Sequence, residues 1–203
     1  MKLNPWMHYQ RSRVLALFRR YDEAVDDLKA ALRLDPAYAR AASSLGFLYG
    51  TLGRHQLAVD QLKSALALRP NDAVLMFNLG YIYHLQKKYE PAIEAFKAAV
   101  QINPRIDRAW YGLGLALASL ERHEESAGAL DRAAELQPMN GYAWFELGMA
   151  YHALGRRDKL DEVIEHLNRF DPKMTQQLVR AVGDAAGTVA APVADSGAMA
   201  KAE

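Results

Sequence analysis

The residues of this chain that could carry chemistry are few, and their spacing does not suit catalysis. The sequence has no cysteine, which excludes disulfides, thiolate zinc sites and cysteine nucleophiles. Gly46, Gly50 and Gly53 lie close together, but no strand precedes them as a phosphate-binding loop requires. The acidic pair Asp26-Asp27 and others like it lie near lysine and arginine at helical spacing, which favours a solvated helix face. No serine elbow or zinc-protease motif occurs. We therefore expect no enzyme activity, no cofactor and no small-molecule substrate.

The composition favours a folded protein with no strong attraction to polyanions. The chain has 203 residues, 51% of them hydrophobic, and 25 basic side chains balance 24 acidic ones to a net charge of +1. Near neutrality argues against a nucleic-acid or anionic-membrane partner. Arginines interrupt residues 1–20, and no stretch approaches the eighteen or so apolar residues of a membrane span. We expect a cytoplasmic protein without membrane insertion.

Prolines show that the chain is built from repeats. Five of them stand 34 residues apart, each two residues after an apolar side chain: Pro36, Pro70, Pro104, Pro138 and Pro172. A constant period of this length is the signature of a solenoid. With proline at position 32, the five repeats span 5–38, 39–72, 73–106, 107–140 and 141–174, after a short lead of residues 1–4.

Two helices are predicted in each repeat. Positions 4, 7, 8 and 11 form one stripe of the first helix, and in repeats two to five position 7 is leucine and position 8 is glycine. Glycine inside a helix costs about 1 kcal/mol relative to alanine, so its recurrence indicates close approach of another helix. The second helix has small residues at positions 20 and 27 and large apolar residues at 24, and the proline ends it.

Repeat four contains Trp110, Leu113, Gly114, Leu130 and Pro138 at positions 4, 7, 8, 24 and 32. With these residues it resembles the tetratricopeptide repeat (TPR) family, and residues 5–174 as a whole share this resemblance. The resemblance implies an all-α, right-handed α-solenoid of five helix-turn-helix repeats. Repeat one has His8, Arg11 and Ser12 in place of Trp, Leu and Gly, and repeat five has Leu160 in place of Ala. Atypical terminal repeats are typical of caps.

The residues after Pro172 divide into a helix and a tail. Met174, Leu178 and Val182 lie at helical spacing, which predicts a short amphipathic helix over 173–182 that caps the fifth repeat, with residues 175–182 lying beyond that repeat. Residues 183–203 are rich in alanine and glycine and contain no aromatic residue. Such a composition buries too little to offset ordering entropy, so we expect a disordered tail.

A second face of the first helix remains for function. Positions 2, 5, 9, 12 and 13 centre about 140° from the packing stripe. The resemblance implies that these positions line a concave groove that binds peptide segments. Aromatic, methionine and arginine side chains, the types enriched at protein interfaces, make up most of the predicted groove: Tyr9, Arg13, Arg40, Phe47, Phe77, Asn78, Tyr81, His84, Arg108, Tyr111, Tyr142, Phe145, Met149 and His152. His84 and His152, two repeats apart, are too distant to share a metal. In the alternative interpretation, some rings pack between neighbouring first helices.

The groove residues also indicate what kind of ligand to expect. Some co-chaperones of this family hold a terminal carboxylate through lysine, arginine and asparagine at positions 2, 5, 6 and 9. Here only Asn78 and Arg108 match that set, since Ser43, Phe47 and Gly112 take the other places. We therefore expect a partner protein or peptide segment with apolar anchors rather than a bare carboxylate.

The charge distribution leaves a second function open. Residues 1–100 carry a net charge of +5 and residues 101–203 a net charge of −4. Oppositely charged ends predict possible self-association by head-to-tail stacking. The main hypothesis is a non-catalytic adaptor or assembly chaperone, and the alternative is a self-assembling scaffold. An accessory targeting module of a separate enzyme is a third, weaker hypothesis, and RNA binding is disfavoured because the first helix has few stacking aromatics.

Overall fold

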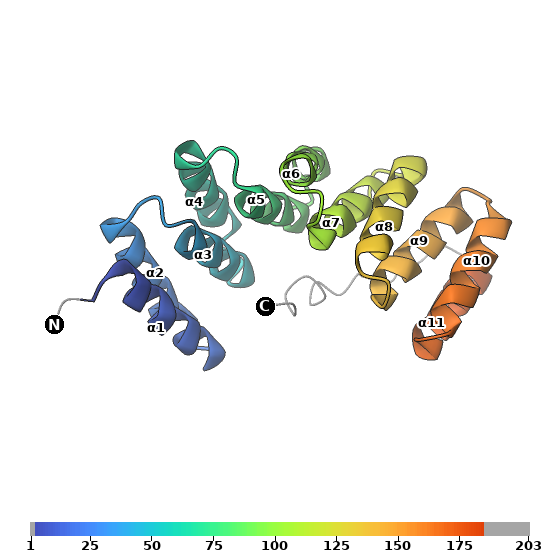
Figure 1. The fold of residues 1–203 in the computed structure, drawn as a ribbon, viewed down its shortest axis with the longest axis horizontal. Helices are drawn as coiled ribbons and strands as arrows, with labels where there is room; N and C mark the ends of the chain where they lie inside the picture. Colours follow the sequence, from blue (N-terminus) through green and yellow to red (C-terminus); the bar gives the residue numbers. More distant parts are fainter. Residues whose placement is uncertain (1–2, 185–203) are drawn as a thin grey trace. The chain divides into compact units, whose positions relative to one another are not determined.

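The computed structural model describes residues 3–184, and within them it contains eleven helices and no strand (Figure 1). This confirms the predicted all-α fold. The chain divides into two compact halves, an N-terminal half of Met1–Pro104 and a C-terminal half of Arg105–Glu203. The helix bounds place one helix pair in each predicted repeat. No helix in the described range is long and apolar enough to span a membrane.

The N-terminal half consists of three helix pairs. Each first helix packs against the second helix of its own pair, and α3 and α5 also pack against the second helix of the pair before. The helices are α1 (Pro5–Leu17), α2 (Tyr21–Leu34), α3 (Ala39–Thr51), α4 (His55–Leu68), α5 (Ala73–Leu85) and α6 (Tyr89–Ile102). The first helices α3 and α5 also contact each other. The result is a row of first helices and a row of second helices.

The C-terminal half has two such pairs and one further helix. Its helices are α7 (Asp107–Ala118), α8 (His123–Leu136), α9 (Gly141–Ala153), α10 (Arg157–Asn168) and α11 (Pro172–Asp184). Helix α11 packs against both α9 and α10, and its Leu178 is fully buried. This is the predicted capping helix, longer by a residue or two at each end than the sequence pattern indicated. The rest of the predicted tail, from residue 185, lies outside the described residues.

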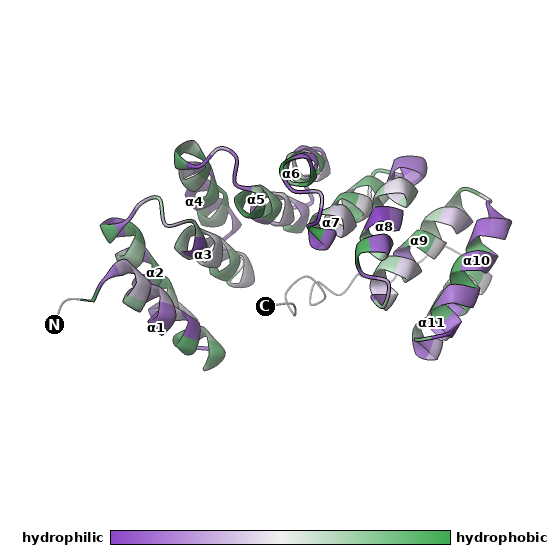
Figure 2. Ribbon diagram, viewed as in Figure 1, coloured by the Kyte–Doolittle hydropathy of each residue, from purple (hydrophilic) through white to green (hydrophobic). Residues whose placement is uncertain are grey.

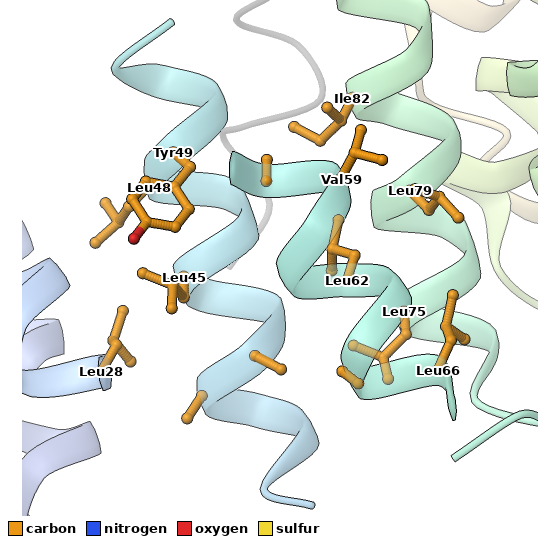
Figure 3. Close-up of a cluster of buried hydrophobic side chains, with 14 of the residues drawn as sticks. Leu28, Leu45, Leu48, Tyr49, Val59, Leu62, Leu66, Leu75, Leu79 and Ile82 are labelled. Atoms are coloured by element: carbon orange, nitrogen blue, oxygen red, sulfur yellow. The ribbon is translucent and has the colours of Figure 1, made fainter. Parts of the chain in front are cut away.

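The core of the N-terminal half lies between its two rows of helices. Figure 3 shows this cluster of buried side chains, which α2, α3, α4 and α5 contribute and which includes Leu45, Leu62 and Leu75. All three are at most 1% exposed. These residues come from the apolar positions that recur every 34 residues, so the repeat itself generates the core.

The turn between the two helices of each repeat has the same backbone conformation throughout. Position 15 has a positive φ of 57–69° in all five repeats, and it is glycine at Gly53 and Gly155. Arg19, Lys87 and Glu121 adopt the same left-handed conformation at a cost of about 1 kcal/mol each. The geometry of the helix pair therefore prevails over local preference at these three sites.

Repeat one replaces the family's apolar contacts with a buried ionic cluster. Asp27 is 2% exposed, and its carboxylate accepts hydrogen bonds from the Arg11 guanidinium and from Nδ1 of His8, which lies 2.8 Å away. Later repeats have Gln61, alanine or valine at the position of Asp27. The departures of His8 and Arg11 from the repeat pattern thus have a common cause, which is the charge of Asp27.

The ionic cluster makes the first helix pair sensitive to acid. Burial alone would raise the pKa of Asp27, but the hydrogen bonds from Arg11 and His8 outweigh it and hold this pKa below its ordinary value. A lowered folded-state pKa contributes stability above about pH 4, the ordinary aspartate pKa, and this contribution disappears as the pH falls through the folded value.

We predict that Asp27→Asn lowers the free energy of unfolding by about 1–3 kcal/mol at pH 7, because Arg11 and His8 lose a charged acceptor. Urea unfolding at pH 7 and pH 3 measures this. The deficit relative to wild type should shrink at pH 3, and the exposed neighbour Asp26→Asn should have little effect at either pH. A deficit that is the same at both pH values would contradict the role of the charge.

Candidate functional site

The candidate site is the face of the first helices that the packing stripe leaves uncovered. Asn4, Asp72 and Asn140 fix where three of these helices begin, because each side chain accepts hydrogen bonds from backbone N–H groups of the first turn. Asp72 and Asn140 are the last residues of their repeats, so the end of one repeat sets the start of the next first helix.

In the N-terminal half, three aromatic residues of this face are only partly covered. Tyr9 of α1, Phe47 of α3 and Tyr81 of α5 pack against the edge of the core while keeping part of each ring exposed. The ring of Tyr9 lies 5.4 Å from that of Tyr38, and burial raises the pKa of Tyr81. We call these three rings, one on each of three successive first helices, the aromatic row.

Charged and polar groups accompany this aromatic row. Arg13 and Arg40 are exposed, and neither has an ion pair with another described residue. Asn78 is half-buried on α5. His84 lies at the end of α5 with its ring edge toward Tyr89, its Nδ1 is buried without a hydrogen-bond partner among residues 3–184, and desolvation lowers its pKa. The neutral imidazole is therefore favoured.

Three predicted groove residues lie in the interior instead. The side chains of Phe77, Tyr111 and Phe145, all at position 5, are 6%, 8% and 9% exposed. Phe77 packs on Phe96 of its own repeat, with ring centroids 6.0 Å apart. The burial of these three rings leaves a ligand little surface at position 5, and Phe77 faces the second helix of its own repeat.

The C-terminal half contributes a smaller set of accessible residues. Tyr142 is 47% exposed on α9, while Met149 and His152 of the same helix and Arg108 of α7 are partly exposed. Spacing of three to four residues places Tyr142, Met149 and their neighbour Glu146 on adjoining turns of α9.

Glu146 is a residue of this face that the sequence analysis missed. It lies at position 6 of repeat five, partly buried, and has no hydrogen bond or ion pair with any other described residue. Burial raises the pKa of Glu146 to about 7. It also interacts electrostatically with Tyr111 of α7, whose pKa is raised chiefly by its own burial. The only signal in the sequence was an acidic residue on a first helix rather than on a second one.

Two clefts lie outside most of the predicted groove. In the N-terminal half, a cleft of about 350 Å³ lies between α2 and α4 and is lined by Lys29, Leu32 and Leu68, among others. In the C-terminal half, a cleft of about 550 Å³ lies between α10 and α11, and His152 is the one predicted groove residue in its lining. No group of three histidine or acidic side chains in the described part of the chain is arranged to hold a metal ion.

Comparison with protein families gives one consistent result. Models described as tetratricopeptide repeat match residues 39–72, 73–106, 92–138 and 111–159, and a model described as TPR repeat matches residues 20–53. Together these matches run from residue 20 to residue 159. A comparison with curated protein sequences finds no match.

Solved structures of similar fold include several TPR proteins. A crystal structure of MamA is 24% identical, with a TM-score of 0.72 over 81% of this chain and 96% of that one. YrrB, described as a TPR protein with an unusual peptide-binding site, is 20% identical, with a TM-score of 0.68 over 85% and 90% of the two chains. A thermophilic TPR protein from Thermus thermophilus, TTC0263, is 21% identical, with a TM-score of 0.66 over 90% and 98%. At these identities the likeness concerns the fold alone.

The raised pKa of Glu146 predicts that the C-terminal half loses stability as the pH rises. Between the ordinary glutamate pKa and about 7, the folded state retains a proton that the unfolded state releases. The free energy of unfolding should therefore fall by about 2–3 kcal/mol across this range, and Glu146→Gln should remove that loss. Urea unfolding at pH 5 and pH 8, followed by tryptophan fluorescence, measures it. Glu94→Gln, which changes an exposed helical glutamate, is the matched control. A Glu146→Gln variant whose free energy of unfolding still falls with pH as in wild type would contradict the raised pKa of Glu146.

Proposed function

Because the chain belongs to the tetratricopeptide repeat family, we propose that it is a non-catalytic interaction module that holds a segment of a partner protein against its first helices. Proteins of this family are generally interaction modules. The finer proposal is that this chain acts as an adaptor or assembly chaperone, with its ligand groove on the face opposite the packing stripe.

One observation carries the proposal, namely the partly exposed aromatic row of Tyr9, Phe47 and Tyr81. Aromatic rings held by a rigid core offer binding energy with little entropy to lose, as in the hot spots of protein interfaces. A partly exposed ring on each of three successive first helices is more than the isolated apolar exposure expected of any surface. The peptide-binding site in the description of YrrB supports the same kind of ligand for this fold.

The charged neighbours of the row narrow the chemistry of the ligand. Arg13 and Arg40 lie at positions 9 and 2 of adjacent repeats and have no ion pair among the described residues. Guanidinium groups at the rim of an apolar surface favour carboxylate side chains in the ligand. We infer that the ligand is an extended or helical segment with apolar anchors and flanking Asp or Glu side chains. Arg13 and Arg40 favour such a segment over a peptide that presents only its terminal carboxylate.

A random dodecapeptide display library selected on the purified chain tests the groove. We predict that selected peptides combine apolar anchors with acidic residues and lose at least about tenfold in affinity for Phe47→Ala/Tyr81→Ala, because that variant removes two ring contacts. Fluorescence anisotropy of labelled peptides measures the affinity.

Two variants serve as controls for this experiment. Leu57→Ala removes a half-exposed leucine from α4, outside the groove, and should leave peptide affinity unchanged. Phe77→Ala is the control for loss of a buried ring, and it should lower the free energy of unfolding by about 3–5 kcal/mol. Peptides that bind Phe47→Ala/Tyr81→Ala as tightly as wild type would exclude this groove as the ligand site.

A self-assembling scaffold is the second candidate function. The net charges of +5 and −4 on the two parts of the sequence support it. The ion pairs Arg11–Asp27, Arg20–Glu23 and Arg54–Asp22 lie within residues 1–100 and leave that net charge unchanged. Screening over about 8 Å at physiological ionic strength weakens the attraction between exposed charges. Charge alone is thus a weak basis for assembly.

A further inference from the structure

The outer face of α1 has the composition of an interface between repeats. Position 10 of the first helix is buried where a preceding repeat lies in the same half, as at Leu48, Ile82 and Ala150, which are 4%, 1% and 4% exposed. The side chain of Ile82, for example, lies against Gly50 of the preceding first helix. In repeat one this position is Val14, which is 55% exposed. Val14 is therefore apolar, like its counterparts in the other repeats, although no other helix of residues 3–184 covers it.

Two neighbours extend this exposed apolar surface. Leu17 and Phe18 follow Val14 at helical spacing and are 79% and 71% exposed. Figure 2 shows the last turn of α1 in the hydrophobic colour. We call Val14, Leu17 and Phe18 the α1 ridge. A contiguous apolar surface of this kind favours association in water.

A cleft of matching character lies at the other end of the sequence. The 550 Å³ cleft between α10 and α11 is lined by Leu160, Ile164, Val179 and Val182 together with His152, Arg157 and Asp161. Val179 is 47% exposed, so this apolar lining is accessible. The cleft is large enough to receive side chains of the size of leucine and phenylalanine.

The charges around the two surfaces are complementary. Residues 5–20 contain four arginines and no acidic residue, and Arg13 and Arg19 have no ion pair with another described residue. Helix α10 has four acidic and two basic residues, and its Asp158 and Asp161 likewise have no ion pair within residues 3–184. Asp161 belongs to the cleft lining itself. Arg157 opposes this pattern, but the acidic charges of α10 outnumber the basic ones.

We propose that the α1 ridge packs, in a second copy of the chain, into the cleft between α10 and α11. The contact is heterologous, because the two surfaces differ, so each copy keeps one unused surface and assembly continues beyond a dimer. Apolar burial supplies the affinity and the arginine–aspartate contacts set the orientation. Apart from Arg13 and His152, no residue of the predicted ligand groove takes part. The variants that test the two proposals change different residues, so either proposal can fail without the other.

A complementation experiment tests the heterologous contact. Leu17→Glu/Phe18→Glu removes the ridge, Val179→Glu/Val182→Glu removes the cleft lining, and Leu57→Glu is a control at a half-exposed leucine on α4. Circular dichroism melting confirms that each variant is folded. Sedimentation velocity over a concentration series, at low and at physiological salt, then gives the oligomeric state of each protein alone and of equimolar mixtures.

We expect wild type and Leu57→Glu to form oligomers that grow with concentration, and each double variant alone to associate at least about tenfold more weakly. An equimolar mixture of the two double variants should form a dimer and nothing larger, because it has one intact ridge and one intact cleft. A monomeric wild type, or a mixture that stays monomeric, would overturn the proposal. Loss of assembly with the ridge variant only, with the cleft variant unaffected, would instead indicate ridge-to-ridge dimers and would also overturn it.

Discussion

The close contact between the two helices of repeats two to four is the constraint on which the rest of the structure depends. A methyl group at Gly114 would lie 2.5 Å from Cγ of Leu130, and one at Gly80 would lie 2.8 Å from Cδ1 of Phe96. The helix backbones therefore approach as closely as glycine permits. In repeat five, Leu178 of α11 occupies this place, 2.7 Å from a methyl group at Gly148, so the capping helix uses the same contact.

Fixing one face of the first helix also determines what its other face can do. Because positions 7, 8 and 11 pack on the second helix, the residues at positions 2, 9 and 12 lie away from that partner. Tyr81 and Phe47 are partly exposed for this reason, whereas Leu79 and Leu45 on the packing stripe are buried. The proposed ligand groove therefore uses a different stripe of the first helix from the one that holds the fold together.

The repeat period predicted the helices, because proline, glycine and leucine at fixed positions are local and recurrent signals. It could not separate exposed from buried rings on the second face. Phe77 and Tyr81 are both aromatic, and only packing in three dimensions, such as that of Phe77 on Phe96, decides that Phe77 is covered. The roles of Asp27 and Glu146 could not be predicted from the sequence for a similar reason. Each is one acidic residue among many, and its role comes from partners, or their absence, in three dimensions.

Alanine substitution at two glycines of the C-terminal half tests the central constraint most directly. Both lie inside helices, but Gly114 faces Leu130, whereas a methyl group at Gly128 would meet nothing within 4 Å. Helix propensity alone favours alanine by about 1 kcal/mol at both sites. We predict that Gly128→Ala raises the free energy of unfolding, while Gly114→Ala lowers it by about 1–2 kcal/mol through overpacking, a loss that should diminish in a Leu130→Ala background. A Gly114→Ala variant as stable as Gly128→Ala would contradict the account.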